Sequence, residues 1–149
     1  MVGGAARRAP LGRAVLVADV NGDALPDLIV GAPQQDVGLV DNGVVTIFLG
    51  LADGGFAAEP SRILSGPFGG DRFGTALTSC DFDGDGLVDL AVSAPNGRNR
   101  DLNPAVNNQG AVHIFKGYPD GFLERADVVV FGVVPAADGS GPVATANLT

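Results

Sequence analysis

Acidic residues recur at alternate positions in two short stretches of this chain. Residues 81–89 read Asp-Phe-Asp-Gly-Asp-Gly-Leu-Val-Asp, and residues 19–27, which lie 62 positions earlier, read Asp-Val-Asn-Gly-Asp-Ala-Leu-Pro-Asp. Carboxylates held this close repel one another unless a cation lies between them. Small residues between the acids let the backbone curl, so that several oxygen atoms can converge on a hard cation such as calcium. The spacing therefore predicts two calcium-binding loops.

Two other interpretations of the acidic stretches are weaker. Asp, Asn and Gly also form ordinary turns between strands, but the recurrence of one series in one register favours metal binding. An EF-hand or dockerin-like loop would need an acidic or similar ligand at its twelfth position, followed by a helix. The twelfth residues here are Val30 and Val92, which lie in strand-like runs, so we reject the EF-hand interpretation.

The composition favours β-structure. Among 149 residues are 23 glycines and 10 prolines, which separate short apolar runs such as 28–30, 44–48 and 128–130. No stretch of helical length shows an apolar spacing of 3.6 residues, so we expect little helix. The length is sufficient for a buried core of ordinary domain size.

The charge excludes nucleic acid as a partner. The formal net charge is −8 and the chain has a single lysine, Lys116, whereas a phosphate backbone requires clustered basic residues. Seven of the 17 acidic residues lie in the two loops, so bound calcium would offset much of this excess. No apolar run reaches transmembrane length, and residues 1–13 lack the apolar segment of a signal peptide. We therefore expect no membrane contact and no signal peptide within this chain.

The two loops belong to a longer internal repeat. Residues 14–18 align with 76–80 and residues 28–33 with 90–95, each 62 apart, and residues 43–50 align with 110–117, now 67 apart. The extra residues fall in the connection 96–109, as expected for a surface loop. With fourth strands near 62–64 and 127–130, each unit has four short strands, which is typical of a propeller blade. The acidic loop then forms the bend between the first two strands.

The motifs beside the loops resemble the FG-GAP repeat of integrin alpha-subunit propellers and related secreted proteins. The second unit has Phe73-Gly74 before its loop and Ser93-Ala94-Pro95 after it, and the first has Leu11-Gly12 and Gly31-Ala32-Pro33. The resemblance covers residues 11–134. It implies an all-β fold made of FG-GAP type four-stranded antiparallel blades. The mild departures from the motif are Leu11, Asn21, Ala24 and Ser93.

The repeat divides the chain into four parts. We expect an N-terminal extension at 1–10, one blade at 11–72, a second at 73–130, and at 131–149 the start of a degenerate third repeat. Phe131-Gly132 would open this third repeat, which lacks the acidic series. A closed propeller generally has about four to eight blades, so two blades form an incomplete propeller. We expect marginal stability or self-association through the open blade faces.

The resemblance also implies ligands for the two calcium ions, because the family's loop binds through side chains at positions one, three, five and nine and the carbonyl at seven. The first site would use Asp19, Asn21, Asp23, the Leu25 carbonyl and Asp27. The second would use Asp81, Asp83, Asp85, the Leu87 carbonyl and Asp89. If charge count dominates, the second site binds more tightly. The first loop also has Ala24 where the second has Gly86, and its bend is costlier if that residue needs a positive φ.

No catalytic set is visible in the sequence. The single histidine, His113, aligns with Thr46 and the single cysteine, Cys80, aligns with Ala18, so neither a Ser/His/Asp nor a Cys/His set can be assembled. We therefore expect no enzymatic activity.

The resemblance instead implies a module in which structural calcium supports protein binding and cell adhesion, outside the cell or at its surface. Its partner would be a protein ligand, a partner subunit or adjacent blades. Calcium affinities of about 10⁻⁴–10⁻³ M, typical of extracellular modules, suit that location. The alternative is a non-catalytic propeller portion of a secreted hydrolase, similar to the blades of glycosylphosphatidylinositol-specific phospholipase D.

Overall fold

The computed structural model describes residues 10–98, 109–119, 121–122, 125–132, 134–135, 142–143 and 146–148. Across these residues the chain forms strands and turns without any helix, as the composition predicted. A helix capable of crossing a membrane is accordingly absent from this part of the chain. The expected N-terminal extension, apart from Pro10, and most of the long connection 96–109 lie outside the described residues.

The first unit forms a four-stranded antiparallel sheet in the order β1-β2-β3-β4. Its strands are β1 (Ala14–Ala18), β2 (Asp27–Ala32), β3 (Val44–Phe48) and β4 (Arg62–Ser65). Side chains of the edge strand β1 alternate between half-buried and exposed, whereas those of the central strand β3 are almost all buried. All four strands were predicted from the sequence.

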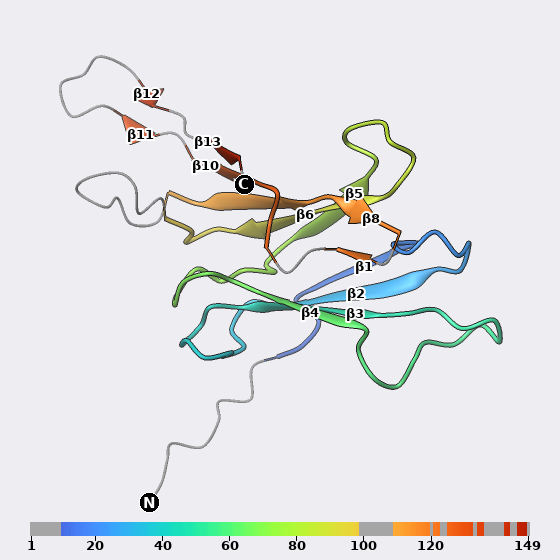
Figure 1. Ribbon diagram of the computed structural model, residues 1–149. Helices are drawn as coiled ribbons and strands as arrows, with labels where there is room; N and C mark the ends of the chain where they lie inside the picture. Colours follow the sequence, from blue (N-terminus) through green and yellow to red (C-terminus); the bar gives the residue numbers. More distant parts are fainter. Residues whose placement is uncertain are drawn as a thin grey trace, which may run out of the picture.

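The second unit repeats this sheet and extends it (Figure 1). Its strands are β5 (Leu77–Cys80), β6 (Asp89–Ala94), β7 (Ala111–Phe115) and β10 (Val128–Phe131). A fifth strand, β13 (Ala146–Leu148), pairs antiparallel with β10 at the sheet edge and was not predicted. Two small hairpins complete the strands: β8 (Gly117–Tyr118) with β9 (Gly121–Phe122), and β11 (Val134–Pro135) with β12 (Pro142–Val143).

The pair Phe131-Gly132 occupies a different place from the one expected. Phe131 is the last residue of β10 and lies opposite Ala111, as Ser65 at the end of β4 lies opposite Val44. The glycine after each of these residues donates a hydrogen bond to the carbonyl of an equivalent glycine. Phe131-Gly132 is thus the counterpart of Ser65-Gly66 and closes the second blade. Where a third repeat would begin remains a prediction.

The two sheets stack on each other around one apolar core (Figure 1). Phe73 is fully buried between them, and its ring packs edge-on to that of Phe115 with centroids 5.9 Å apart. Both sheets contribute to this core, which includes Ile29, Val45, Ile47, Leu64, Leu90 and Val92.

The sheets stack in the same orientation, as propeller blades do. Val45 and Leu64, cross-strand neighbours in the first sheet, are 0% and 1% exposed. Their counterparts in the second sheet, Val112 and Val130, are 40% and 42% exposed. The face that the first sheet buries is therefore the face that the second leaves open. The first sheet leaves its other face open, where Val15 is 60% exposed. Two blades of an incomplete propeller have this arrangement.

The Phe73-Gly74 turn packs into a socket of glycines on the first sheet. A Cβ atom on Gly31 would lie 2.1 Å from the carbonyl oxygen of Gly74, and one on Gly43 would lie 2.1 Å from that of Phe73. Only glycine permits backbones to approach this closely. The glycine of the Gly-Ala-Pro motif is thus required because the next blade packs against it. At the equivalent place in the second sheet Ser93 carries a side chain, whose Oγ accepts a hydrogen bond from Ala76 N at 2.9 Å.

Candidate metal sites

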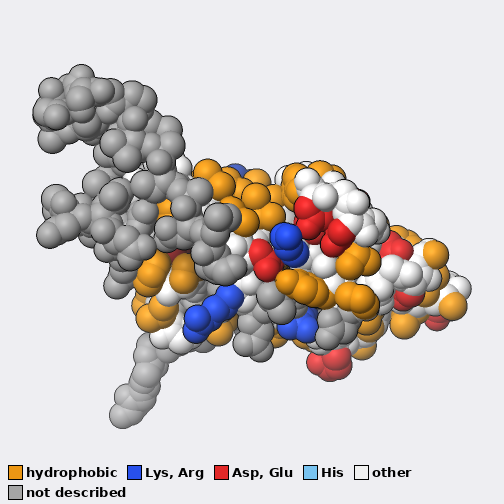
Figure 2. Space-filling model, turned by 45° about the horizontal axis from the view of Figure 1, so that its top comes forward, with side chains coloured by type: hydrophobic (Ala, Val, Ile, Leu, Met, Phe, Trp, Pro, Cys, Tyr) orange, Lys and Arg blue, Asp and Glu red, His pale blue; other side chains and the backbone are white. Residues whose placement is uncertain are grey.

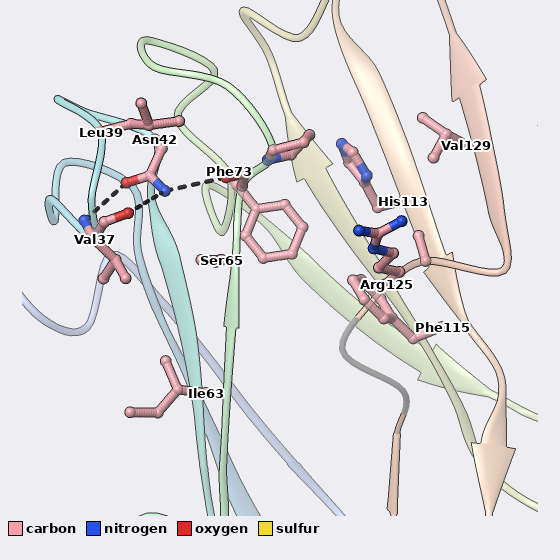
Figure 3. A pocket seen from close by; sticks show the side chains of 13 residues that line it. Val37, Leu39, Asn42, Ile63, Ser65, Phe73, His113, Phe115, Arg125 and Val129 are labelled. Carbon is pink, nitrogen blue, oxygen red and sulfur yellow. Dashed lines mark hydrogen bonds between the residues drawn. The ribbon is translucent and has the colours of Figure 1, made fainter. Parts of the chain in front are cut away.

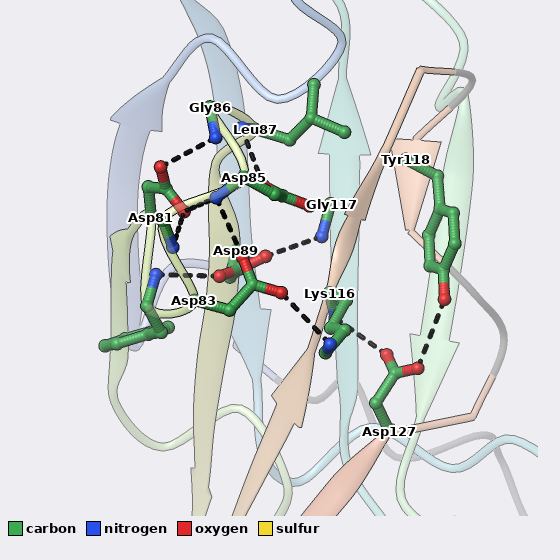
Figure 4. A network of polar contacts seen from close by, with 12 residues as sticks. Asp81, Asp83, Asp85, Gly86, Leu87, Asp89, Lys116, Gly117, Tyr118 and Asp127 are labelled. Atoms are coloured by element: carbon green, nitrogen blue, oxygen red, sulfur yellow. Dashed lines mark hydrogen bonds and ion pairs between the residues drawn. The ribbon is translucent and has the colours of Figure 1, made fainter.

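The second acidic loop, between β5 and β6, is folded around the carboxylate of Asp81 (Figure 4). Its Oδ1 accepts hydrogen bonds from the backbone N–H of Gly84 at 2.7 Å and of Asp85 at 3.1 Å, and its Oδ2 accepts one from Gly86 at 2.8 Å. Gly84 and Gly86 have φ angles of 76° and 90°, a region that glycine adopts without strain. The residue at loop position one therefore determines the curl of the loop.

The carboxylate of Asp89, at loop position nine, ties the loop to the rest of the blade. Asp89 is 1% exposed and is the first residue of β6. Its Oδ2 accepts a hydrogen bond from Phe82 N and its Oδ1 accepts one from Gly117 N, both at 2.8 Å. A Cβ on Gly117 would lie 2.3 Å from the carbonyl oxygen of Val88, so glycine is needed for this approach. Asp89 thus links the start of the loop to the segment after β7.

The first loop, between β1 and β2, has the same hydrogen bonds. Asp27 is fully buried and accepts hydrogen bonds from Val20 N and Gly50 N, both at 2.8 Å. Asp19 matches Asp81 and accepts hydrogen bonds at 2.7–3.2 Å from the N–H groups of Gly22, Asp23 and Ala24. Two loops 62 residues apart therefore fold by one set of side-chain to backbone contacts.

Ala24 has a φ of 66°, and Gly86 at the matching position of the second loop has a φ of 90°. The bend therefore does require a positive φ. An alanine in this region costs about 1 kcal/mol relative to glycine. The first loop stores this strain and the second does not.

Three of the expected ligand residues come together in the second loop. Oxygen atoms of Asp81, Asp83 and Asp89 all lie within 4.8 Å of one another. Asp85 lies outside this group, and its Oδ1 accepts a hydrogen bond from Leu87 N at 2.9 Å. No other acidic, histidine or cysteine group of this kind occurs among the residues that the structure describes.

The first loop has an amide at position three, where the second has a carboxylate. Asn21 Oδ1 accepts a hydrogen bond from Asp23 N at 3.1 Å, and Asn21 Nδ2 donates one to Asp23 Oδ2 at 3.0 Å. Asp23 Oδ1 in turn accepts from Leu25 N at 2.8 Å. Both loops present only oxygen donors, which suits calcium and not zinc. Calcium ligation by the ten residues of the two loops stays a prediction.

A basic residue that the sequence analysis did not assign to the site lies beside the second loop. Lys116 Nζ is 3.0 Å from Asp83 Oδ2, and Figure 2 shows a basic side chain beside acidic ones on the displayed face. The hydrogen bond from Lys116 lowers the pKa of Asp83, and the same contact raises the pKa of Lys116. Leu49 occupies the matching position of the first unit. This difference between the two units is the feature of the sequence that could have pointed to Lys116.

Asp127 extends this polar network (Figure 4). Its Oδ2 accepts a hydrogen bond from Lys116 N at 2.7 Å, and its Oδ1 accepts one from the Tyr118 hydroxyl at 3.4 Å. The negative charge of Asp127 raises the pKa of Tyr118. The backbone of Lys116 is therefore fixed next to the loop.

A cavity of about 600 Å³ lies between the sheets, away from the loops, and His113 and Phe73 line it (Figure 3). His113 is 5% exposed, packs edge-on to Phe73 with centroids 5.2 Å apart, and its Nε2 has no hydrogen-bond partner among the described residues. Burial lowers the pKa of His113 from 6.5 to about 4. This position, which aligns with Thr46, serves the packing of β7.

The buried histidine predicts acid sensitivity. The unfolded chain binds a proton at His113 near pH 6.5 and the folded chain only near pH 4, so stability is lost as the pH falls through this window. Between pH 7 and pH 5 the loss is about 2 kcal/mol. Urea unfolding at both pH values should show a drop that is smaller by this amount in His113→Gln. Equal drops in the two proteins would contradict the assignment.

Comparisons with known proteins agree with this geometry. The FG-GAP repeat model matches residues 11–48 and 73–115, together more than half of the chain, and an FG-GAP-like repeat model matches residues 31–92.

Integrin alpha-IIb of Mus musculus is 35% identical over 136 residues, which is 87% of this chain and 12% of that protein. Integrin alpha-3 of Mus musculus is 32% identical over 127 residues, 81% of this chain and 11% of that protein. Phosphatidylinositol-glycan-specific phospholipase D of Rattus norvegicus is 41% identical over 85 residues, 56% of this chain and 10% of that protein.

The chain thus spans roughly a tenth of the length of these relatives. The matched segments contain both acidic loops and the Phe73-Gly74 turn that joins the blades. On the strength of the repeat, the stacked sheets and these matches, the chain belongs to the FG-GAP repeat family.

Proposed function

We propose that this chain is a calcium-stabilised protein-binding module. The observation that carries the proposal is the pair of equivalent loops, each built on a buried aspartate, Asp27 or Asp89. In the second loop, oxygen atoms of Asp81, Asp83 and Asp89 also lie within 4.8 Å of one another. A calcium ion accepts six to eight oxygen ligands, which the five residues of each loop and water would supply. The ion would offset the repulsion between carboxylates that the fold brings together.

The aspartates of the second loop would have different roles in calcium binding. Asp81 and Asp89 are already fixed by backbone N–H groups, so little freedom is lost when they bind an ion. A carboxylate oxygen can accept more than one contact, and the existing hydrogen bonds therefore do not exclude ligation. Asp83, which pairs with Lys116, and Asp85, which accepts a hydrogen bond from Leu87 N, are exposed and would complete the shell of the ion. Calcium would thus stiffen the bend between the first two strands of each blade.

A calcium titration followed by thermal melting tests this proposal. With a dissociation constant of about 10⁻⁴ M, 10 mM calcium stabilises the folded chain by about 2.7 kcal/mol per site, and the Tm rises by several degrees. Asp85→Ala should remove part of the rise, and Asp23→Ala with Asp85→Ala should remove most of it. Asp53→Ala, an exposed aspartate in another turn, is the control and should leave it intact. An unchanged Tm of the unmodified chain in calcium would overturn the proposal.

The role in adhesion rests on the relatives. Two of the compared proteins are named integrin alpha chains, and we infer a module that faces the cell exterior and binds a protein ligand, a partner subunit or adjacent blades. The exposed apolar side chains on both outer faces, Val15 and Val112 among them, suit contact with a further blade or a second copy. The net charge of −8 argues against a nucleic-acid partner. Light scattering over a range of protein concentrations would show self-association directly.

A second function is supported by the match to phosphatidylinositol-glycan-specific phospholipase D. In that case the blades would form a non-catalytic part of a secreted hydrolase. The gene sequence on either side of these residues distinguishes the two. A hydrolase domain encoded upstream would support this second function, and further blades followed by a membrane anchor would support the adhesion module.

A further inference from the structure

Two backbone hydrogen bonds, from the N–H groups of Lys116 and of Gly117, hold Lys116 beside the second loop. Its own N–H donates to Asp127 Oδ2 at 2.7 Å, and the N–H of the next residue, Gly117, donates to Asp89 Oδ1 at 2.8 Å. Asp89 is one of the proposed calcium ligands, and Gly117, which binds it, directly follows Lys116 in the sequence. From there its ammonium reaches Asp83 Oδ2 at 3.0 Å (Figure 4).

The first loop keeps the glycine contact, from Gly50 N to Asp27 Oδ1 at 2.8 Å, but lacks the three charged residues. The counterpart of Lys116 is Leu49, that of Asp83 is Asn21, and that of Asp127 is Ser61. The additional carboxylate of the second loop therefore occurs together with an additional cation. With three aspartates in the first loop, and four aspartates and one paired lysine in the second, both loops carry the same net charge of −3.

We propose that Lys116 is a built-in competitor of the metal at the second loop, which pairs with Asp83 when calcium is absent and lowers calcium affinity when it is present. The inference rests on the proposed calcium function. A divalent ion that takes Asp83 as a ligand must displace the ammonium or bind beside it, and both alternatives weaken binding. The charge-count expectation that the second site binds more tightly is therefore offset by the lysine.

Lys116→Leu, which installs the residue of the first unit, should tighten calcium binding at the second loop about tenfold at low salt. One exposed charge acting on a divalent ion over several ångströms has an effect of this size. The gain should shrink in high salt, because exposed charges are screened. Calorimetric titration with calcium chloride, in a chain whose first site is disabled by Asp23→Ala, measures the second site alone. Lys116→Gln should give the same gain if the leucine variant folds poorly.

Two controls separate this role from a general loss of positive charge. Arg13→Leu removes one exposed cation before β1, and the calcium affinity should stay within about twofold. In an Asp83→Asn background, Lys116→Leu should raise the affinity by less than it does in the unmodified loop, because no carboxylate at position three then holds the ammonium beside the ion. In calcium-free buffer Lys116→Leu should lower the Tm slightly, since four carboxylates then lack their cation.

Equal calcium affinities with and without Lys116 would overturn the inference while leaving the calcium site intact. An equal gain from Arg13→Leu would also overturn it, because the effect would then be one of net charge. If the chain with Lys116 and both loops unmodified binds no calcium at all, the proposed function fails and the inference fails with it. The titration of the unmodified chain thus distinguishes the two failures.

Discussion

Replacing Gly31 with serine is expected to lower the free energy of unfolding by about 3 kcal/mol or more, at the upper end of what overpacking costs. The new Cβ would lie 2.1 Å from the carbonyl oxygen of Gly74, which is backbone and cannot rotate away. The Phe73-Gly74 turn would have to leave its socket, and the two blades would separate. Urea unfolding in saturating calcium measures the loss. A domain of this size has about 5–15 kcal/mol in total, so the variant should lose a substantial part of its stability.

The reverse substitution at the matching position is the control. Ser93→Gly removes one hydrogen bond, from Ala76 N to Ser93 Oγ, and should cost about 1 kcal/mol. The two changes exchange the same residue types at equivalent places in the two blades. If Gly31→Ser cost no more than Ser93→Gly, the packing of the turn against Gly31 would not hold the blades together.

Replacing Asp89 with alanine is expected to destabilise the chain by about 2–4 kcal/mol even without calcium. The change leaves the N–H groups of Phe82 and Gly117 without their acceptor. A buried donor without a partner, such as Gly117 N–H, costs about 1–3 kcal/mol, and the partly buried Phe82 N–H adds to this loss. The change also removes the link between the loop and Gly117, the first residue of β8. The measurement is urea unfolding in buffer that contains a chelator, so that metal ligation does not contribute. Asp27→Ala should behave in the same way in the first blade, through Val20 and Gly50.

Asp85→Ala serves as the matched control for Asp89→Ala. Asp85 is exposed and its carboxylate accepts a hydrogen bond from the N–H of Leu87. In chelator this variant should cost no more than about 1 kcal/mol, although it should weaken calcium binding. Equal losses for Asp85→Ala and Asp89→Ala in chelator would show that position nine has no structural role apart from the metal.

The fold was largely predictable because the chain contains two repeat units that can be aligned with each other. The interval of 62 residues places both acidic loops, both first strands and both second strands in register, and the shift to 67 locates the insertion. The structure confirms the four strands of each blade and the bend at each loop. The cost expected for Ala24 depended on a positive φ at this position, and the structure shows a φ of 66° there. A repeat makes such predictions possible, because a strand or loop that is inferred in one unit should recur at the aligned residues of the other.

Features that depend on contacts between distant residues were not predictable from the spacing. β13 joins β10 through backbone hydrogen bonds, and its short sequence has no distinctive pattern. Phe131-Gly132 matches the Phe-Gly motif in letters, but the register of β10 with β7 assigns it to the end of a blade. The buried role of Asp89 depends on Gly117, 28 residues later. Lys116 differs from Leu49 in the alignment, yet only the folded chain shows that it reaches Asp83.

The number of calcium ions bound per chain tests the central claim most directly. Equilibrium dialysis of the metal-free protein against calcium in the millimolar range should give two ions per chain, one for each loop. Asp23→Ala and Asp85→Ala should each reduce the number toward one. A count of zero for the unmodified chain, or a count that neither variant changes, would contradict the claim that these loops are calcium sites.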